Sequence, residues 1–248
     1  MRIGGIIDIS TKDIPNRAST VIFTVGCNFN CNFCHNKKLL EEKTGRECNI
    51  DEITSLIKKN ILVNCVSISG GEPTLQEDLL ELCKKLFQIG KFVSLDTNGS
   101  NPKVIKNLIP YLNRVALDIK APLKSFNLER IIGLRINPEL IIGTFNILNQ
   151  HENIEFEVRT TYVENLFTPK DIEEIIYFLK EHNFTGTYIL QQYQYSDGVG
   201  TEYEHKLRTP THELLLNILE PYKFLELPFE IYLRDNIVGY RSINELFN

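Results

Sequence analysis

Residues 24–36 of the chain read TVGCNFNCNFCHN and begin at the end of an apolar, β-branched run at residues 20–25. Cys27, Cys31 and Cys34 follow a Cys-x3-Cys-x2-Cys spacing, so one short loop can place three thiolates around a small metal centre. Thiolates are the usual ligands of a cubane iron–sulfur cluster. Three of them leave one iron without a protein ligand, and a catalytic metal needs such an open position.

The remaining cysteines leave other interpretations of the loop open. His35 follows Cys34, and zinc sites also use three cysteines and one histidine. Cys65 falls in an apolar run and Cys83 on an apolar helical face, so both are predicted to be core residues. Cys48, just before a predicted helix cap, is the one ambiguous further ligand. Disulfides are not expected in a chain of this size without an export signal.

Strand-like and helix-like patterns alternate along the chain. Alternating strands and helices predict parallel strands joined by right-handed crossovers. Six units are fewer than the eight of a closed barrel, so an open doubly wound sheet and a partial barrel both fit. Residues 2–10 are expected to pair with the first strand, and residues 229–235 are expected to form an edge strand. Residues 1–248 are expected to form one domain, with its core at about residues 19–220. The six strand-like runs are residues 20–25, 62–69, 92–96, 114–120, 154–162 and 188–193.

Helical signals separate most of these runs. Asn49 resembles a cap before the apolar positions of residues 53–57, and Thr168-Pro169 resembles a helix start. An apolar face is predicted from Leu79 to Phe87, and residues 138–149 and 212–219 are also predicted to be helical.

Polar segments stand at the ends of successive predicted strands. The carboxyl ends of parallel strands share one rim, and ligands bind there in α/β folds. The sequence therefore predicts one site at this rim. Besides the cysteine loop, its segments are residues 69–73 (SGGEP), 96–99 (DTNG) and 118–120 (DIK), with Arg159, Gln191 and Gln192.

Two of these segments carry a resemblance. The cysteine loop resembles the Cys-x3-Cys-x-aromatic-Cys signature of the radical S-adenosylmethionine (SAM) superfamily, with Phe33 in the aromatic position, and SGGEP resembles its GGEP segment. Within the superfamily the chain resembles glycyl-radical enzyme activating enzymes, in particular those of anaerobic ribonucleotide reductase. This similarity runs from Gly4 to about Pro122 through CNFCHN, SGGEPTLQ, LDTNGSNP and ALDIKAP, and more weakly through residues 158–160. Residues 13–16, DIPN, depart from the Asp-aromatic-Pro-Gly that relatives often have.

The resemblance implies a fold, two cofactors and a set of ligands. The fold is a partial (β/α)6 TIM-like barrel of the radical SAM type. One [4Fe–4S] cluster would be held by Cys27, Cys31 and Cys34, and SAM would chelate the open iron. The cofactor-binding residues implied are Phe33, Cys34, His35, Gly70, Gly71, Glu72, Asp96, Asn98, Asp118, Lys120 and Arg159.

Several of these roles have a structural alternative. The main chain of Gly70 and Gly71 would meet the methionine part of SAM, because a Cβ would block close approach, or form a plain turn. Phe33 would lie against the adenine, or simply pack in the loop.

The polar residues have structural alternatives too. Asp118 and Lys120 would reach the ribose and carboxylate of SAM, unless Lys120 is solvated. Asp96 with Thr97 would hold a monovalent cation or form an Asx-type turn. Arg159 would contact a carboxylate or form a structural ion pair.

The resemblance also implies an activity. A flavodoxin- or ferredoxin-like reductant would reduce the cluster, SAM would be cleaved to a 5′-deoxyadenosyl radical, and the radical would take a glycine α-hydrogen from a glycyl-radical enzyme, anaerobic ribonucleotide reductase above all. A second hypothesis is a radical SAM enzyme acting on a small molecule, such as a deazapurine synthase. A third is a metal-binding or electron-carrying module without SAM chemistry. No cysteine follows Cys83, so one cluster is expected.

Composition and charge do not support other classes of protein. The net charge is −5, from 27 basic and 32 acidic residues, whereas a protein that grips nucleic acid usually has a basic excess. No apolar run reaches the about 18 residues that a membrane span needs, and the N-terminal residues do not resemble a signal peptide. We therefore expect no nucleic-acid partner, no membrane insertion and a cytoplasmic location.

Overall fold

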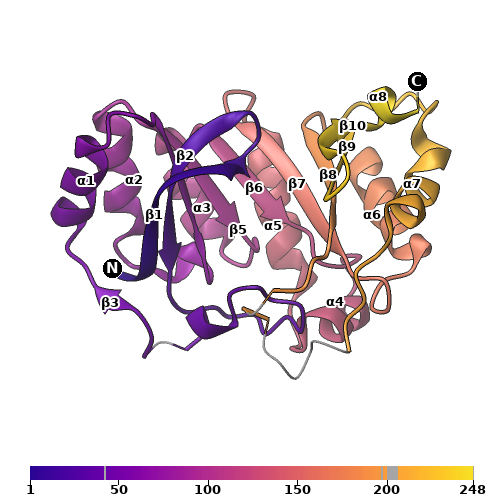
Figure 1. Ribbon diagram of the computed structural model, residues 1–248, viewed down its shortest axis with the longest axis horizontal. Helices are drawn as coiled ribbons and strands as arrows, with labels where there is room; N and C mark the ends of the chain where they lie inside the picture. Colours follow the sequence, from indigo (N-terminus) through magenta and orange to yellow (C-terminus); the bar gives the residue numbers. More distant parts are fainter. Residues whose placement is uncertain (42, 197, 200–205, 248) are drawn as a thin grey trace.

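The computed structural model describes residues 1–41, 43–196, 198–199 and 206–247, and its described strands form one sheet of ten (Figure 1). The strand order is β10-β9-β8-β7-β6-β5-β4-β2-β1-β3. From β2 to β9 every neighbouring pair is parallel, which gives seven parallel strands within the described residues. These strands are β2 (Arg17–Thr24), β4 (Cys65–Gly70), β5 (Phe92–Thr97), β6 (Arg114–Asp118), β7 (Glu155–Tyr162), β8 (Thr187–Gln192) and β9 (Glu230–Asp235).

Antiparallel strands flank this parallel core on both sides. β1 (Arg2–Ile14) forms a hairpin with β2, and the short β3 (Arg46–Glu47) pairs with the start of β1. At the other end β10 (Gly239–Ser242) forms a hairpin with β9. Hairpins therefore occupy both margins of the curved sheet.

Helices cover the convex face of the sheet, and Figure 1 looks into the concave face. Side chains cap several of them: Thr168 and Asp171 form a reciprocal capping box, and Asn49, Asn137 and Thr211 each accept a main-chain N–H. The helices are α1 (Ile50–Lys59), α2 (Leu79–Gln88), α3 (Pro102–Leu108), α4 (Ser125–Ile132), α5 (Pro138–Asn149), α6 (Pro169–Glu181), α7 (His212–Leu219) and α8 (Ile243–Leu246).

The core lies between these helices and the sheet. The predicted face of α6 is buried, with Ile172 and Leu179 fully inaccessible to solvent. In α2 the predicted face is buried from Leu79 to Leu86, but Phe87 is 43% exposed and does not belong to it. Burial of apolar surface of this kind stabilises a fold by roughly 25 cal/mol per Å².

The α/β class and the open, partial barrel are confirmed, with three corrections. The strand expected at residues 62–69 begins only at Cys65, because Leu62 is 79% exposed in the preceding loop. The strand expected at the edge, residues 229–235, is flanked by β10 and is not an edge strand. It also extends the parallel sheet by one strand beyond the six predicted.

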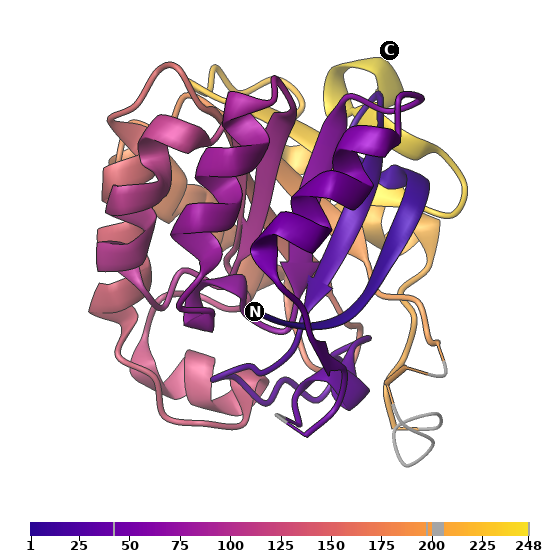
Figure 2. The same cartoon turned by 90° about the vertical axis from the view of Figure 1, so that its left-hand side faces the viewer.

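The sheet does not close into a barrel, but its two margins approach each other. Arg234 of β9 donates a hydrogen bond to the main-chain carbonyl of Lys12 in β1. Figure 2 shows the β1–β2 hairpin and the C-terminal strands on the same side of the molecule, opposite helices α2 and α3. Within the described residues, no helix combines the length and the apolar character that a bilayer crossing requires.

Candidate cofactor-binding site

A cavity of 290 Å³ opens at the carboxyl ends of the parallel strands. The strand-end rule thus brings together predicted site residues that are as far as 132 positions apart in the chain, from Cys27 to Arg159. Each residue for which a cluster or cofactor role was predicted lines this cavity: Cys27, Cys31, Phe33, Cys34, His35, Gly70, Gly71, Glu72, Asp96, Asn98, Asp118, Lys120 and Arg159.

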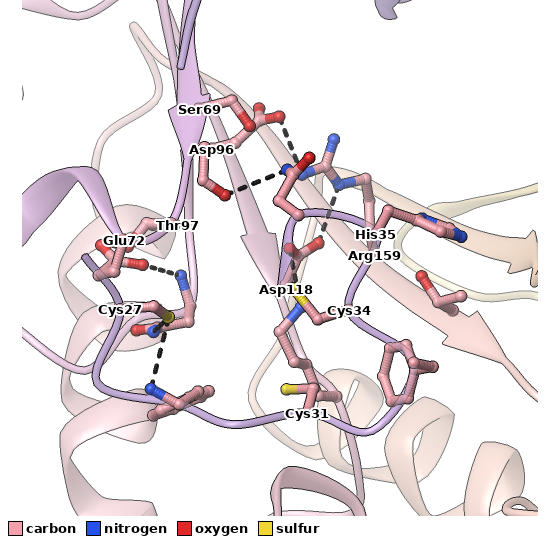
Figure 3. Close-up of a pocket in the computed structure, with 18 of the residues that line it drawn as sticks. Cys27, Cys31, Cys34, His35, Ser69, Glu72, Asp96, Thr97, Asp118 and Arg159 are labelled. Atoms are coloured by element: carbon pink, nitrogen blue, oxygen red, sulfur yellow. Dashed lines mark hydrogen bonds and ion pairs between the residues drawn. The ribbon is translucent and has the colours of Figure 1, made fainter. Parts of the chain in front are cut away.

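The three cysteines of the loop after β2 face a common space (Figure 3). Burial raises the pKa of Cys27 to about 11 and that of Cys31 to about 12, so both thiols are protonated at neutral pH without a metal. The Asn98 side chain fixes the loop, because its Nδ2 lies 2.9 Å from Asn28 Oδ1 and 3.9 Å from Cys27 Sγ. Binding of a metal centre by these thiols would release their protons.

Gly70 and Gly71 let the end of β4 lie directly on the start of the cysteine loop. Gly70 has a φ of +118°, and a Cβ there would lie 2.3 Å from the main-chain nitrogen of Thr24. A Cβ on Gly71 would lie 2.0 Å from the Gly26 carbonyl oxygen. The Gly71 N–H donates to the Thr24 carbonyl at 2.9 Å. Both glycines are therefore required by packing between two strand ends, apart from any contact with a ligand.

Glu72 joins the GGEP turn to the end of β5. Its carboxylate is 1% exposed and accepts hydrogen bonds from the Thr74 N–H and hydroxyl, from the Thr97 hydroxyl at 2.7 Å and from the Asn98 N–H at 2.7 Å. Burial raises the pKa of Glu72, and these donors oppose the rise. With both oxygens engaged, Glu72 holds the positions of the two segments that border the cavity.

Arg159 connects the carboxylates at the ends of β5 and β6 (Figure 3). Its Nε lies 3.0 Å from Asp118 Oδ1, and its Nη2 lies 3.2 Å from Asp96 Oδ2. Of the two roles considered for Arg159, the structural ion pair is thus present. Asp96 takes part in this ion pair, whereas it was predicted to hold a monovalent cation or to form an Asx-type turn.

Lys120 and Asp118 form a second ion pair at the same rim. The Lys120 Nζ lies 3.1 Å from Asp118 Oδ2. Burial favours the neutral forms of both groups. Arg159 and Lys120 together outweigh it for Asp118, whose pKa is lowered, and Asp118 outweighs it for Lys120, whose pKa is raised. Lys120 therefore remains a cation on the wall of the cavity, where it can bind an anionic group.

The aromatic residues of the loop are held by the chain itself. Phe33 is 4% exposed and packs edge-on against Phe167, with 6.4 Å between ring centroids. His35 stacks on Tyr193, its Nε2 lies 2.6 Å from the Gln194 carbonyl oxygen, and its ring points away from the three sulfur atoms (Figure 3). The described residues contain no group of three or more His, Cys, Asp or Glu side chains placed to hold a single metal ion.

Cys48 lies outside the cavity. Its main-chain N–H donates to the Met1 carbonyl at 2.9 Å, and it is not among the residues that line the site. The cavity therefore offers three cysteine ligands from the described part of the chain, as the loop spacing predicts.

Several charged residues in and around the cavity were not predicted from the sequence. Arg114 is 2% exposed and its Nη2 lies 2.7 Å from Glu157 Oε1. Arg114 does not line the cavity, but Lys12, Asp13 and Arg234 do. A signal exists in hindsight: Glu157 and Arg159 alternate with apolar residues within a strand-like run, which is the pattern of a polar inward face.

The donor set fits an iron–sulfur cluster with one open iron. The ligands are three cysteines on one loop, their sulfur atoms face one cavity, and a fixed cation stands on the cavity wall. Thiolates are the usual ligands of such clusters. The remaining cavity, lined by Lys120, Asp118 and the glycine turn, has the polar groups that an amino-acid-bearing nucleoside requires.

Three proteins illustrate the similarity of this chain to known ones. A Methanocaldococcus jannaschii protein with the provisional name glycyl-radical enzyme activating enzyme is 36% identical over 215 residues, covering 84% of this chain and 86% of the relative. A 7-carboxy-7-deazaguanine synthase of Methanospirillum hungatei is 27% identical over 180 residues, covering 68% and 73%. The crystal structure of Streptococcus suis SuiB bound to SAM has the same fold, with a TM-score of 0.68 and 19% identity over 88% of this chain and 50% of SuiB.

The family comparison covers the site. The radical SAM superfamily matches residues 21–184, which include the cysteine loop and the ends of β4 to β7 that line the cavity. With the match spanning well over half of the sequence, the chain belongs to the radical SAM superfamily, which implies a [4Fe–4S] cluster and SAM as its cofactors.

Proposed function

We propose that the chain is a glycyl-radical enzyme activating enzyme, which removes an α-hydrogen from one glycine of a partner enzyme, most simply anaerobic ribonucleotide reductase. One observation carries the proposal: the similarity to the M. jannaschii relative extends over 84% of this chain and 86% of that protein, so the two share nearly their whole length. The segments LDTNGSNP and ALDIKAP support an activating enzyme over a deazapurine synthase, because they match activating enzymes better.

Cys27, Cys31 and Cys34 would hold the cluster, and SAM would occupy the rest of the cavity. When bound and reduced by a flavodoxin- or ferredoxin-like protein, the cluster supplies the electron that cleaves SAM into methionine and a 5′-deoxyadenosyl radical. The protein's contribution is to bind, orient and shield these groups.

Individual side chains have separate tasks in this proposal. Lys120, kept protonated by Asp118, would donate to the SAM carboxylate. Arg159 would act as a positioning residue, because it holds Asp118 from the opposite side. Phe33, which is buried on the cavity wall, would exclude water from one side of the site.

A second function has its own support. The 27% identity to a 7-carboxy-7-deazaguanine synthase over 68% of this chain favours a small-molecule substrate for the same cofactors. The two proposals share the cysteine loop and SAM and differ in the hydrogen donor. An experiment that identifies the donor therefore separates them.

The test is electron paramagnetic resonance after anaerobic reconstitution with iron and sulfide. We would add dithionite, SAM and the anaerobic ribonucleotide reductase from the same genome. The expected result is a glycine-centred doublet and about four iron atoms per chain, as one [4Fe–4S] cluster requires. Iron well above that value would contradict the expectation of a single cluster.

Two cysteine variants provide the matched pair. Cys31→Ala should abolish both the iron content and the doublet, whereas Cys48→Ala, outside the cavity, should retain both. Free 5′-deoxyadenosine without a doublet would reject this partner and keep the SAM chemistry. Neither product from a protein with its full iron content would reject the proposed function in favour of a metal-binding module.

A further inference from the structure

A second cavity adjoins the cofactor cavity. It has a volume of 660 Å³, within the range of about 300–1,000 Å³ that ligand pockets occupy. Lys12, His35, Gln191 and Arg234 line both cavities, so the second opens onto the first at these residues. Residues from the β1–β2 hairpin and from the β9–β10 hairpin form its two sides. The second cavity is therefore a route from the surface to the cofactor site.

Free strand edges border this second cavity. β10 is the last described strand at one end of the sheet, and at the other end the outer edge of β1 is paired by β3 only at Arg2 and Ile3. Thr11 of β1 and Gly239 of β10 both line the second cavity. An unpaired edge presents main-chain N–H and C=O groups that can bind another extended chain. The walls of the cavity thus suit a peptide in extended conformation.

Two polar side chains stand where the cavities meet. Gln191 of β8 and Arg234 of β9 are Cα partners in the parallel register, so they lie side by side. Within the described part of the chain, the Arg234 guanidinium makes one hydrogen bond, to the Lys12 carbonyl oxygen, and the Gln191 side chain makes no hydrogen bond. A guanidinium has five N–H donors, so most of those on Arg234 remain for a ligand.

The surroundings of Arg234 call for an acceptor of hydrogen bonds. Burial and the nearby Arg159 lower the pKa of Arg234, and the carboxylates of Glu157, Asp13 and Asp96 offset only part of this effect. The Asp235 carboxylate, although next in sequence to Arg234, is fully buried and is already occupied by His212 at 2.5 Å and by the N–H groups of Ile237 and Val238. Carbonyl oxygens of a peptide main chain would supply the missing acceptors.

We propose that the second cavity binds an extended peptide segment through its main chain, with Arg234 and Gln191 holding peptide groups next to the cofactor cavity. The inference rests on the proposed function and deepens it, because the segment would be the glycine-bearing loop of the partner enzyme. Arg234 acts as a substrate-binding residue. The free edges of β1 and β10 select an extended backbone, and Gln191 can both donate to and accept from one peptide unit.

The test is a fluorescence anisotropy titration of the reconstituted, SAM-bound protein. The probe is a fluorescein-labelled synthetic peptide that copies the glycine-bearing loop of the anaerobic ribonucleotide reductase from the same genome. Arg234→Ala should weaken binding about 10- to 100-fold, as expected for loss of hydrogen bonds from a charged group. Arg241→Ala, on the exposed side of β10 with a surface ion pair to Glu245, should stay within about twofold of the unaltered protein.

A second variant, which blocks the cavity sterically, tests the peptide site independently in case Arg234→Ala does not fold. Ala18 is exposed on β2 and lines only the second of the two cavities, so Ala18→Trp should block the peptide without entering the cofactor site. The expected result is again at least a roughly tenfold loss of affinity. Peptide binding by the unaltered protein that neither Arg234→Ala nor Ala18→Trp weakens would overturn the inference, and so would no binding at all.

The two proposals fail in different ways. If the peptide binds in an Arg234-dependent manner but no glycine radical forms on the intact reductase, the peptide site stands and the proposed function fails. If the radical forms equally well with Ala18→Trp and Arg234→Ala proteins, the proposed function stands and the peptide site fails.

Discussion

Replacing Arg159 by methionine removes the cation that joins the ends of three strands. Arg159 is 9% exposed, and its guanidinium lies 3.0 Å from Asp118, 3.2 Å from Asp96 and 3.8 Å from Glu157. Methionine keeps much of the side-chain volume, so the main change is in charge. The variant leaves Asp96 and Asp118 without their shared partner, although Lys120 still pairs with Asp118.

The magnitude follows from breaking a buried ion pair on one side. Such a change costs about 3–5 kcal/mol, because a buried charge is left uncompensated. For a chain of 248 residues, each kcal/mol shifts the melting temperature by about 2–4 °C. We therefore expect Arg159→Met to lower the melting temperature by about 6–20 °C.

Circular dichroism melts measure this shift, with Arg241→Met as the matched control. Arg241 also lies on a strand and pairs with a glutamate, but both side chains are more than half exposed. An exposed pair contributes about 0–1 kcal/mol, so the control should melt within about 4 °C of the unaltered protein.

The pH dependence of the same melts gives a second readout. Burial alone would raise the pKa of Asp118, but Arg159 and Lys120 lower it below its usual value. A lowered folded-state pKa adds stability above the unfolded-state pKa of about 3.9 and loses it as the pH falls through the folded-state value. The difference in melting temperature between the unaltered protein and Arg159→Met should therefore narrow as the pH falls from neutral toward that range. The reasoning would be refuted if Arg159→Met lowered the melting temperature by less than Arg241→Met does. It would also be refuted if the difference from the unaltered protein grew at acidic pH.

Two further predictions concern the glycine turn and the cavity wall. Gly71→Ala should destabilise the fold by about 1–3 kcal/mol, because the new Cβ would lie 2.0 Å from the Gly26 carbonyl oxygen. The control, Gly143→Ala inside α5, should stabilise the fold by about 0.5–1 kcal/mol, because the nearest atom to its new Cβ is 3.6 Å away. Thermal melts measure both changes, and equal effects would contradict the packing argument. Lys120→Gln should weaken SAM binding to the reconstituted protein about tenfold or more in equilibrium dialysis. The control, Lys124→Gln, should leave the affinity unchanged, because the Lys124 side chain is 67% exposed. Equal SAM affinities of the two variants would remove Lys120 from the proposed site.

The fold was largely predictable because apolar periodicity and capping agree along most of the chain. The helices at residues 138–149 and 212–219 and the cap at Thr168 lie where the sequence places them. Periodicity fails where apolar residues are exposed: Leu62 is 79% exposed in a loop, although it was predicted to be the first residue of a strand. It also missed α4, a helix of eight residues whose N-cap residue, Lys124, makes no side-chain cap.

The location of the site was predictable, and its internal pairing was not. Because parallel strands end on one rim, polar residues after β4, β5 and β6 had to gather there. The sequence cannot say which of them pair, since pairing depends on distances set by strand register. Asp96 was therefore expected in a turn or cation site, but it pairs with Arg159, 63 positions along the chain by the difference of residue numbers. Glu72 and its four donors from residues 74, 97 and 98 escaped prediction for the same reason.

The central claim is that the hydrogen removed by this chain comes from a glycine of a protein. The direct measurement is mass spectrometry of the 5′-deoxyadenosine released when the reconstituted protein acts on anaerobic ribonucleotide reductase that carries α-deuterated glycine. The account predicts deuterium in the 5′-deoxyadenosine, and none when the Cys31→Ala protein is used. Deuterium-free 5′-deoxyadenosine, released at the same rate with or without the reductase, would contradict it.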